Sequence, residues 1–157
     1  MLNELQLTYR FDSMAVVAHS MGGLVGRDLI NRNLAQGKRS VIDEFISISS
    51  PWGGHDTAAR AASAPIAVPA WYDMAPDGQF LREVMAQPLP ATIPFYLLFT
   101  YRAGGLLRGA NSDGTITLKS QLDPRAQQQA TRVIGFDEDH VSVLRATESI
   151  ATINALL

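Results

Sequence analysis

Short apolar runs rich in β-branched and aromatic residues alternate along the chain with segments in which apolar residues recur every three or four positions. The short runs predict four strands, at residues 14–19, 41–49, 93–101 and 132–136. The longer spacing predicts helices at residues 22–35, 77–86 and 141–157. Because a helix between two strands usually forms a right-handed crossover, this order predicts an α/β fold with a mainly parallel sheet flanked by helices. Ligands of such sheets bind beyond the carboxyl ends of the strands.

Two of the predicted helices have an apolar stripe, which indicates a buried face. In the helix at residues 22–35 the stripe contains Val25, Leu29, Ile30 and Leu34. In the helix at residues 141–157 it contains Ala146, Ile150, Ile153 and Leu157. Residues 58–90 interrupt the alternation with a stretch rich in Ala and Pro, and we interpret this stretch as an insertion within a single domain of residues 1–157.

The composition excludes several classes of protein. The 157 residues carry 13 Lys and Arg against 15 Asp and Glu, so the chain lacks the positive charge that nucleic-acid binding requires. Without cysteine it has no disulfide, no thiolate metal ligand and no cysteine nucleophile. The longest nearly apolar stretch, at residues 93–101, is too short to span a bilayer, so we expect no integral membrane segment. No cofactor is implied.

The first candidate for chemistry is Ser20, in the segment Ala18-His19-Ser20-Met21-Gly22. A predicted strand turns here into a predicted helix, and small residues two positions before and after the serine allow a tight turn that exposes its hydroxyl. Serine is also favoured as the N-terminal cap of a helix, so capping is an alternative role. The sequence A-H-S-M-G-G resembles the nucleophile elbow, G-x-S-x-G, of the α/β-hydrolase family, particularly of its lipases and esterases.

A serine nucleophile needs a base, and this base needs a third group that orients it. Of the three histidines, His19 lies inside the elbow and is expected to point away from Ser20, which leaves His55 and His140. His140 follows a predicted strand and stands at the entry to the last predicted helix. Its segment resembles the D-H-x-x-[ILV] segment that carries the family's catalytic histidine, so His140 is the candidate base.

The candidate acid is Asp113. Residues 111–121 resemble the family's segment S-D-G-x-V-x-x-x-S, which presents the acid, although Asn-Ser-Asp-Gly is also an ordinary turn sequence. Asp123, which precedes a proline, and Asp139, which adjoins His140, are the weaker candidates. The carboxylates at residues 137–139 are an alternative Ca²⁺ site, as near the catalytic histidine of some lipases, but the EF-hand spacing is absent.

The resemblance implies a serine hydrolase of carboxylic esters, with lipid esters as the preferred substrates. Ser20 would attack the carbonyl and form an acyl-enzyme, His140 would act as general base and then general acid, and Asp113 would orient His140. The backbone N–H of Met21 would be one oxyanion-hole donor. Acyl transfer and thioester hydrolysis on the same fold are alternatives. An alternative of another class is a non-catalytic fragment or an interaction module.

Four further residues are candidates for substrate contact. Trp52 lies in Ser-Pro-Trp-Gly-Gly, which resembles a segment near the family's pocket, T-P-x-x-G. Residues 58–90 would then form a cap over the pocket, with Trp71, Met74 and Phe80 as contacts for an acyl chain. Core packing is the alternative for these side chains.

The resemblance covers only the C-terminal portion of the family's fold. In the family several strands precede the elbow, and a loop often marked His-Gly donates the second oxyanion-hole amide. Here only residues 1–13 precede the first predicted strand, Leu2 and Leu5 fit the tail of a helix, and no His-Gly occurs. We therefore expect a fragment or an abbreviated relative, in which the cut sheet leaves an apolar strand edge that favours pairing with another chain.

Overall fold

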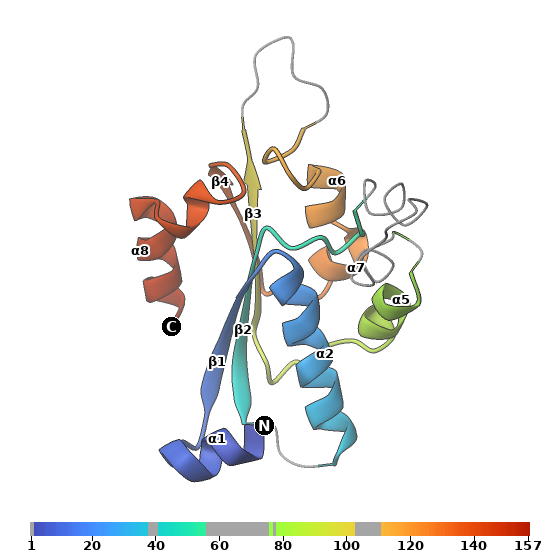
Figure 1. Ribbon diagram of the computed structural model, residues 1–157, viewed down its shortest axis with the longest axis vertical. Coiled ribbons are helices and arrows are strands. Elements are labelled where there is room, and N and C mark those ends of the chain that lie inside the picture. Colours follow the sequence, from blue (N-terminus) through green and yellow to red (C-terminus); the bar gives the residue numbers. More distant parts are fainter. Residues whose placement is uncertain (1, 38–40, 56–75, 77, 103–110) are drawn as a thin grey trace, which may run out of the picture.

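The centre of the molecule is a parallel sheet of four strands. The computed structural model describes residues 2–37, 41–55, 76, 78–102 and 111–157. The strands are β1 (Met14–His19), β2 (Ile42–Ile48), β3 (Phe95–Tyr101) and β4 (Arg132–Asp137), and they lie in the order of the sequence, each parallel to the next (Figure 1). The four predicted strands and the α/β class are confirmed.

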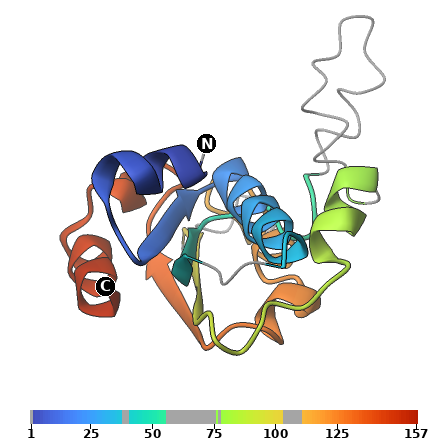
Figure 2. The ribbon, with the colours of Figure 1, turned by 90° about the horizontal axis from the view of Figure 1, so that it is seen from below.

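Helices cover both faces of this sheet. Figures 1 and 2 show α2 (Met21–Ala35) and α5 (Gln79–Met85) on one face and α8 (Thr147–Leu156) on the other. The first helix is α1 (Leu2–Tyr9), which Leu2 and Leu5 predict. Between β3 and β4 lie the short helices α6 (Leu118–Gln121) and α7 (Pro124–Gln127), which the hydrophobic pattern does not predict.

Alternate residues of the strands pack into two separate cores, because successive side chains of a strand point to opposite faces. Phe45, Phe95 and Leu97 are fully buried on the face of α2 and α5. Ile46 and Leu98, next to them in sequence, are equally buried on the face of α8. A central strand with both faces covered reads as a continuous apolar run, which is why the sequence pattern located β2 and β3 well.

The predicted helix at residues 141–157 is two helices, so this prediction is wrong. A 3-10 helix, η1 (Ser142–Leu144), precedes α8, and Ala146 between them is extended, with φ −71° and ψ 135°. Ser149 is fully buried, which its hydroxyl tolerates because it hydrogen-bonds to the Val143 and Ala146 carbonyls. The buried face of α8 therefore contains Ser149, Ile153 and Leu156. Ile150 and Leu157 of the predicted stripe are 43% and 62% exposed.

In α2, Leu24, Gly26 and Ile30 face the core, whereas Val25 of the predicted stripe is 54% exposed. Gly26 permits this packing, since a Cβ there would lie 3.1 Å from the ring of Phe45 and 3.3 Å from Val16. The absence of a side chain at Gly26 therefore lets α2 pack closely against Phe45 and Val16 of the sheet.

Part of the predicted cap belongs to the core. Residues 56–75 and 77 lie outside the described residues, but α5 falls within the interval 58–90. Its Leu81 and Val84 are buried in the same core as α2. These two side chains of α5 therefore serve the core, and the cap over residues 58–90 stays a prediction.

Within the described sheet β1 is an edge strand that pairs only with β2, and its Val17 is 45% exposed. No helix among the described residues is long and apolar enough to cross a membrane.

Candidate active site

Ser20 occupies a sharp turn between the last residue of β1 and the first residue of α2. Its φ of 56° and ψ of −133° are uncommon for a residue with a side chain, and such strain often marks functional sites. Its N–H donates a hydrogen bond of 2.8 Å to the Ile48 carbonyl at the end of β2. The side chain makes no capping bond to α2, so the capping alternative is wrong, and its hydroxyl lies toward His140 instead.

The two glycines after Ser20 have different structural roles. A Cβ on Gly22 would meet the Cβ of Ala18 at 3.8 Å, an ordinary contact, so the small residues that flank the serine face one another. A Cβ on Gly23 would lie 2.0 Å from the Ser50 hydroxyl oxygen. Gly23 therefore allows the first turn of α2 to pack against the residues that follow β2.

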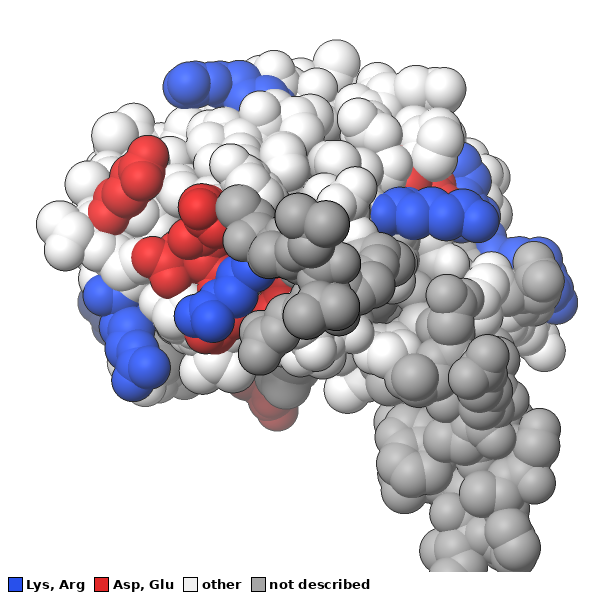
Figure 3. Space-filling view, turned by 90° about the horizontal axis from the view of Figure 1, so that it is seen from above, with Lys and Arg blue, Asp and Glu red and all other residues white. Residues whose placement is uncertain are grey.

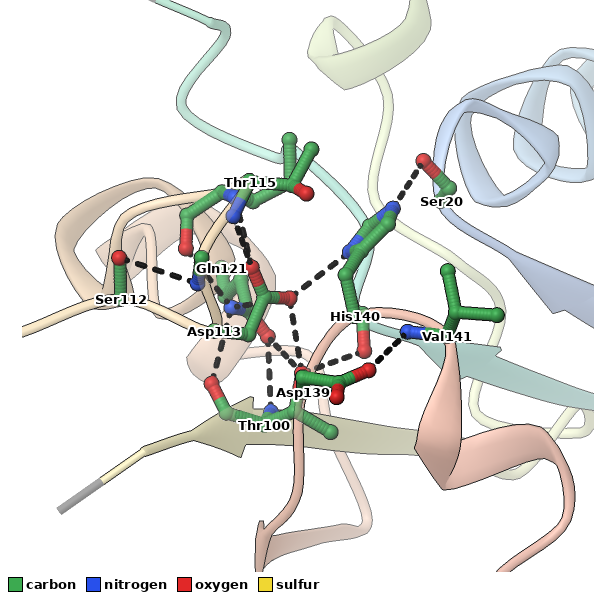
Figure 4. Close-up of polar contacts among 12 residues, drawn as sticks. Ser20, Thr100, Ser112, Asp113, Thr115, Gln121, Asp139, His140 and Val141 are labelled. Atoms are coloured by element: carbon green, nitrogen blue, oxygen red, sulfur yellow. Dashed lines mark hydrogen bonds and ion pairs between the residues drawn. The ribbon is translucent and has the colours of Figure 1, made fainter.

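His140 lies between Ser20 and Asp113, residues that are far apart in the sequence. Its Nε2 is 2.9 Å from Ser20 Oγ, and its Nδ1 is 2.8 Å from Asp113 Oδ2 (Figure 4). The His140 backbone N–H donates to the Asp113 carbonyl at 3.1 Å, which ties the two loops together. The three candidate residues thus form one continuous chain of hydrogen bonds, from a carboxylate through an imidazole to a hydroxyl.

Asp113 is 1% exposed, and its carboxylate accepts hydrogen bonds on both oxygens. The backbone N–H groups of Thr115 and Ile116 donate to Oδ1 at 2.9 and 2.7 Å, in a turn that Gly114 makes with a φ of 93°. Burial by itself raises the pKa of Asp113. The hydrogen bonds from His140, Ile116, Thr115 and Thr100 outweigh burial and hold this pKa below its ordinary value. The carboxylate is therefore ionised beside His140.

The two weaker candidates for the acid have other partners. Asp123 caps α7 and forms an ion pair of 2.8 Å with Arg125. Asp139 accepts bonds from the backbone of Val141 and Ser142, which lower its pKa, and pairs with Arg102 at 2.9 Å. Figure 3 shows acidic side chains gathered beside a basic one on this end of the molecule. The described residues contain no group of three or more His, Asp or Glu arranged to hold a metal ion.

His19, which was expected to point away from Ser20 and to have no role, contacts His140 at the candidate site. Its Nε2 is 2.7 Å from the His140 carbonyl oxygen, and the two rings lie 4.6 Å apart. A carbonyl only accepts, so Nε2 of His19 carries the proton. Burial lowers the pKa of His19, and the positive charge that His140 can carry acts in the same direction. Alternation along β1 places His19 on the same face of the sheet as Val17. Their partners in β2, Ile46 and Ile48, pack with Val143 of η1 on this face, so the alternation was the available signal.

Met21 is the first residue of α2, and the first N–H groups of a helix lack acceptors within the helix. The Met21 N–H, next to Ser20, therefore has no acceptor within α2. The Met21 side chain is 40% exposed beside it.

Trp52, which follows β2, and Phe80, in α5, both pack in the core on the face of α2. Trp52 is 1% exposed and its ring meets those of Phe45 and Phe95 edge-on. Phe80 packs partly buried against the same cluster. Core packing therefore accounts for both side chains. Trp71 and Met74 lie outside the described residues.

The chain is similar to known proteins in part of its sequence and in its fold. Residues 2–64 match the family model of lecithin:cholesterol acyltransferase. No curated protein matches the sequence significantly. Among solved structures, Bacillus licheniformis lipase BlEst2 has a TM-score of 0.72 at 18% identity, over 99% of this chain and 69% of that one.

Two further structures are similar at lower scores. The product of the Listeria innocua gene lin2722 has a TM-score of 0.62 at 17% identity, over 96% of this chain and 59% of its own. The Vlm2 thioesterase domain, in a structure with a bound dodecadepsipeptide, has a TM-score of 0.51 at 14% identity, over 98% of this chain and 71% of its own. The chain thus spans less than two thirds of the Listeria protein.

Proposed function

From the α/β-hydrolase fold of this lipase-like chain, we propose that it is a serine hydrolase of carboxylic esters that works through an acyl-enzyme on Ser20. The observation that carries the proposal is the chain of hydrogen bonds from Asp113 through His140 to Ser20. A serine that merely stabilised a turn would need neither a strained backbone nor an imidazole at 2.9 Å. A base and an orienting acid in contact with a hydroxyl are the requirements for a serine nucleophile.

In the proposed reaction, His140 Nε2 accepts the hydroxyl proton as Ser20 Oγ bonds to the ester carbonyl carbon. The carbonyl electrons move to its oxygen, and His140 then gives the proton to the alcohol oxygen as the carbon–oxygen bond breaks. A water molecule, deprotonated by His140, hydrolyses the resulting acyl-enzyme. Asp113, ionised and bound to Nδ1, holds His140 in the tautomer whose Nε2 accepts a proton and stabilises the imidazolium that forms.

The backbone N–H of Met21 is the proposed oxyanion-hole donor within this chain. It lies beside Ser20 at the start of a helix of 15 residues, whose dipole also favours negative charge there. The loss of one donor of a pair typically costs about 10²–10³ in kcat, roughly 3–4 kcal/mol.

Lipid esters are the proposed substrate class. This is supported by the match of residues 2–64, which contain the elbow, to an acyltransferase family and by the fold shared with a lipase. The similarity to a thioesterase domain keeps thioesters and acyl transfer as second candidates, since they use the same acyl-enzyme.

Reaction with a fluorophosphonate, which modifies activated serines, tests the proposal directly. We expect one equivalent of label by intact mass, lost in Ser20→Ala and in His140→Ala but retained in Ser13→Ala, which changes an exposed serine. A series of p-nitrophenyl esters of rising chain length, with the thioester analogues beside it, would then assign the substrate. A folded wild-type chain that takes no label, or a Ser20→Ala variant that is labelled equally, would overturn the proposal and favour a non-catalytic role.

A further inference from the structure

Gln121, the last residue of α6, is buried against Asp113. Its side chain is 1% exposed, and its Nε2 lies 3.2 Å from Asp113 Oδ2. The same nitrogen lies 3.0 Å from the Thr100 carbonyl and 3.1 Å from the Ile116 carbonyl, while Gln121 Oε1 accepts a bond of 2.9 Å from the Thr100 N–H. One amide side chain thus joins strand β3, the turn after Asp113 and the carboxylate itself (Figure 4).

The groups around Gln121 determine which way its amide points. The Thr100 N–H only donates and therefore requires the amide oxygen, whereas the two carbonyls and the ionised carboxylate only accept and require the amide nitrogen. A reversed amide would meet like groups at every one of these contacts, which buried polar groups avoid. The donor that Gln121 directs at Asp113 is therefore set by its surroundings.

The Gln121 side chain also provides the backbone hydrogen bonds that a neighbouring strand would otherwise make to the end of β3. The pairing of β2 with β3 ends at Ile48 and Leu98, and Ser49, with a φ of 50°, turns the chain away after donating to the Leu98 carbonyl at 2.9 Å. Two residues farther along β3, the N–H and C=O of Thr100 face the position that β2 would have filled. Both bind the Gln121 side chain, so Thr100 has a partner for each of its backbone groups although β2 has ended.

A hydroxyl completes the contacts of Asp113 Oδ2. Thr100 Oγ1 donates to this oxygen at 2.8 Å and lies 2.6 Å from Ser49 Oγ, which must then be the donor to Thr100. Thr100 and Ser49 are both fully buried. Oδ2 thus receives bonds from His140, Thr100 and Gln121.

We propose that Gln121 is a positioning residue for the hydrolase reaction, which holds the Asp113 carboxylate in the orientation that His140 requires. This inference rests on the proposed function. The terminal torsion of an aspartate is broad, so its carboxylate plane is fixed only by its hydrogen bonds. A carboxylate that is free to rotate would still lie near His140, but it would accept the Nδ1–H bond for a smaller fraction of the time. His140 would then be oriented toward Ser20 for a smaller fraction of the time, and the rate would fall.

The test compares Gln121→Met with the wild-type chain in fluorophosphonate labelling. Methionine keeps the length of the side chain and removes every polar group. The final extent of labelling reports how much protein is folded, and the dependence of the rate on probe concentration separates the maximal rate, kinact, from probe binding, KI. We expect kinact to fall about 10- to 100-fold, as for a lost hydrogen bond to a charged group, with KI unchanged.

Two controls separate positioning from general destabilisation. Gln128→Met makes the same change at an exposed position of the next segment. Val84→Ala weakens α5, a helix that packs in the core with α2. Both should keep the wild-type kinact. Gln121→Asn retains the amide but cannot reach all of its partners, so an intermediate kinact is expected, and this variant serves if Gln121→Met does not fold.

A double-mutant cycle shows whether Gln121 acts through Asp113. In an Asp113→Asn background, Gln121→Met should change kinact by less than about twofold, because residues that act as a unit are not additive. A wild-type kinact in Gln121→Met, or the full effect persisting in the Asp113→Asn background, would overturn this inference alone. A wild-type chain without labelling at Ser20 would overturn the proposed function and the inference together.

Discussion

The nucleophile and the acid of the candidate site are held in place by different means. Ser20 is held through its backbone, by a φ of 56°, a bond from its N–H to β2 and the close packing of Gly23 behind it. Asp113 is held through its side chain, whose two oxygens accept bonds from β3, α6, the following turn and His140. Changes near Ser20 should therefore alter the stability of the fold, whereas changes near Asp113 should alter the rate of reaction in a fold that persists.

The largest expected effect comes from Asp113→Asn. The amide keeps the size of the side chain but offers a donor where His140 Nδ1–H needs an acceptor, which favours the wrong tautomer. We expect the fluorophosphonate labelling rate to fall by about 10⁴-fold, with near-native circular dichroism.

The matched control is Asp123→Asn, at an aspartate that caps α7 and makes no bond to His140. It should keep the wild-type labelling rate. A normal rate in Asp113→Asn would mean that another group is the acid and that the hydrogen bonds around Asp113 do not serve the reaction.

The backbone side of the comparison is tested by Gly23→Ala against Gly22→Ala. A methyl group on Gly23 collides with Ser50, and overpacking of this kind typically costs about 1–3 kcal/mol. The same change at Gly22 meets only an ordinary contact and replaces glycine in a helix, so it should be neutral or stabilising by up to about 1 kcal/mol. Urea unfolding with an unchanged m-value measures both, and equal midpoints for the two variants would contradict this assignment.

His19 connects the two sides, because it precedes Ser20 and donates to the His140 carbonyl. His19→Phe keeps a ring and removes the donor, and a neutral hydrogen bond of about 0.5–1.5 kcal/mol corresponds to a labelling rate lower by about 2- to 10-fold. His19→Gln, which can still donate, should recover part of the loss. If both variants react alike, the ring and not its N–H matters at this position.

The smallest expected effect is on stability at low pH. Because the folded-state pKa of Asp113 is depressed, its contribution to the free energy of unfolding is complete above the ordinary aspartate pKa of about 3.9. This contribution is lost as the pH falls through the lower folded-state value. Urea unfolding from about pH 5 downward should show a shallower decline for Asp113→Asn than for the wild-type chain. Parallel curves would mean that the ionised carboxylate does not stabilise the fold.

Local patterns predicted the four strands and the turn at Ser20 well, and they failed where tertiary contacts decide the structure. The buried strands are apolar on both faces, so their positions follow from composition alone. The break between η1 and α8 was missed because it depends on the Ser149 hydroxyl, which binds two carbonyls and buries a polar residue where an apolar stripe was expected. Trp52 lay within the resemblance to a family pocket, but its two aromatic neighbours hold it in the core.

The sequence by itself determined the order of the strands and of the longer helices, and the residue types of the candidate site, because strand and turn preferences act between near neighbours. Only the tertiary structure decided that Ser20, Asp113 and His140 meet, that His19 faces His140, and that Gln121 and Thr100 hold the acid. These contacts join residues from separate strands and loops. A hydrogen bond between distant segments has no periodicity along the chain, and it exists only once the sheet has brought the ends of its strands together.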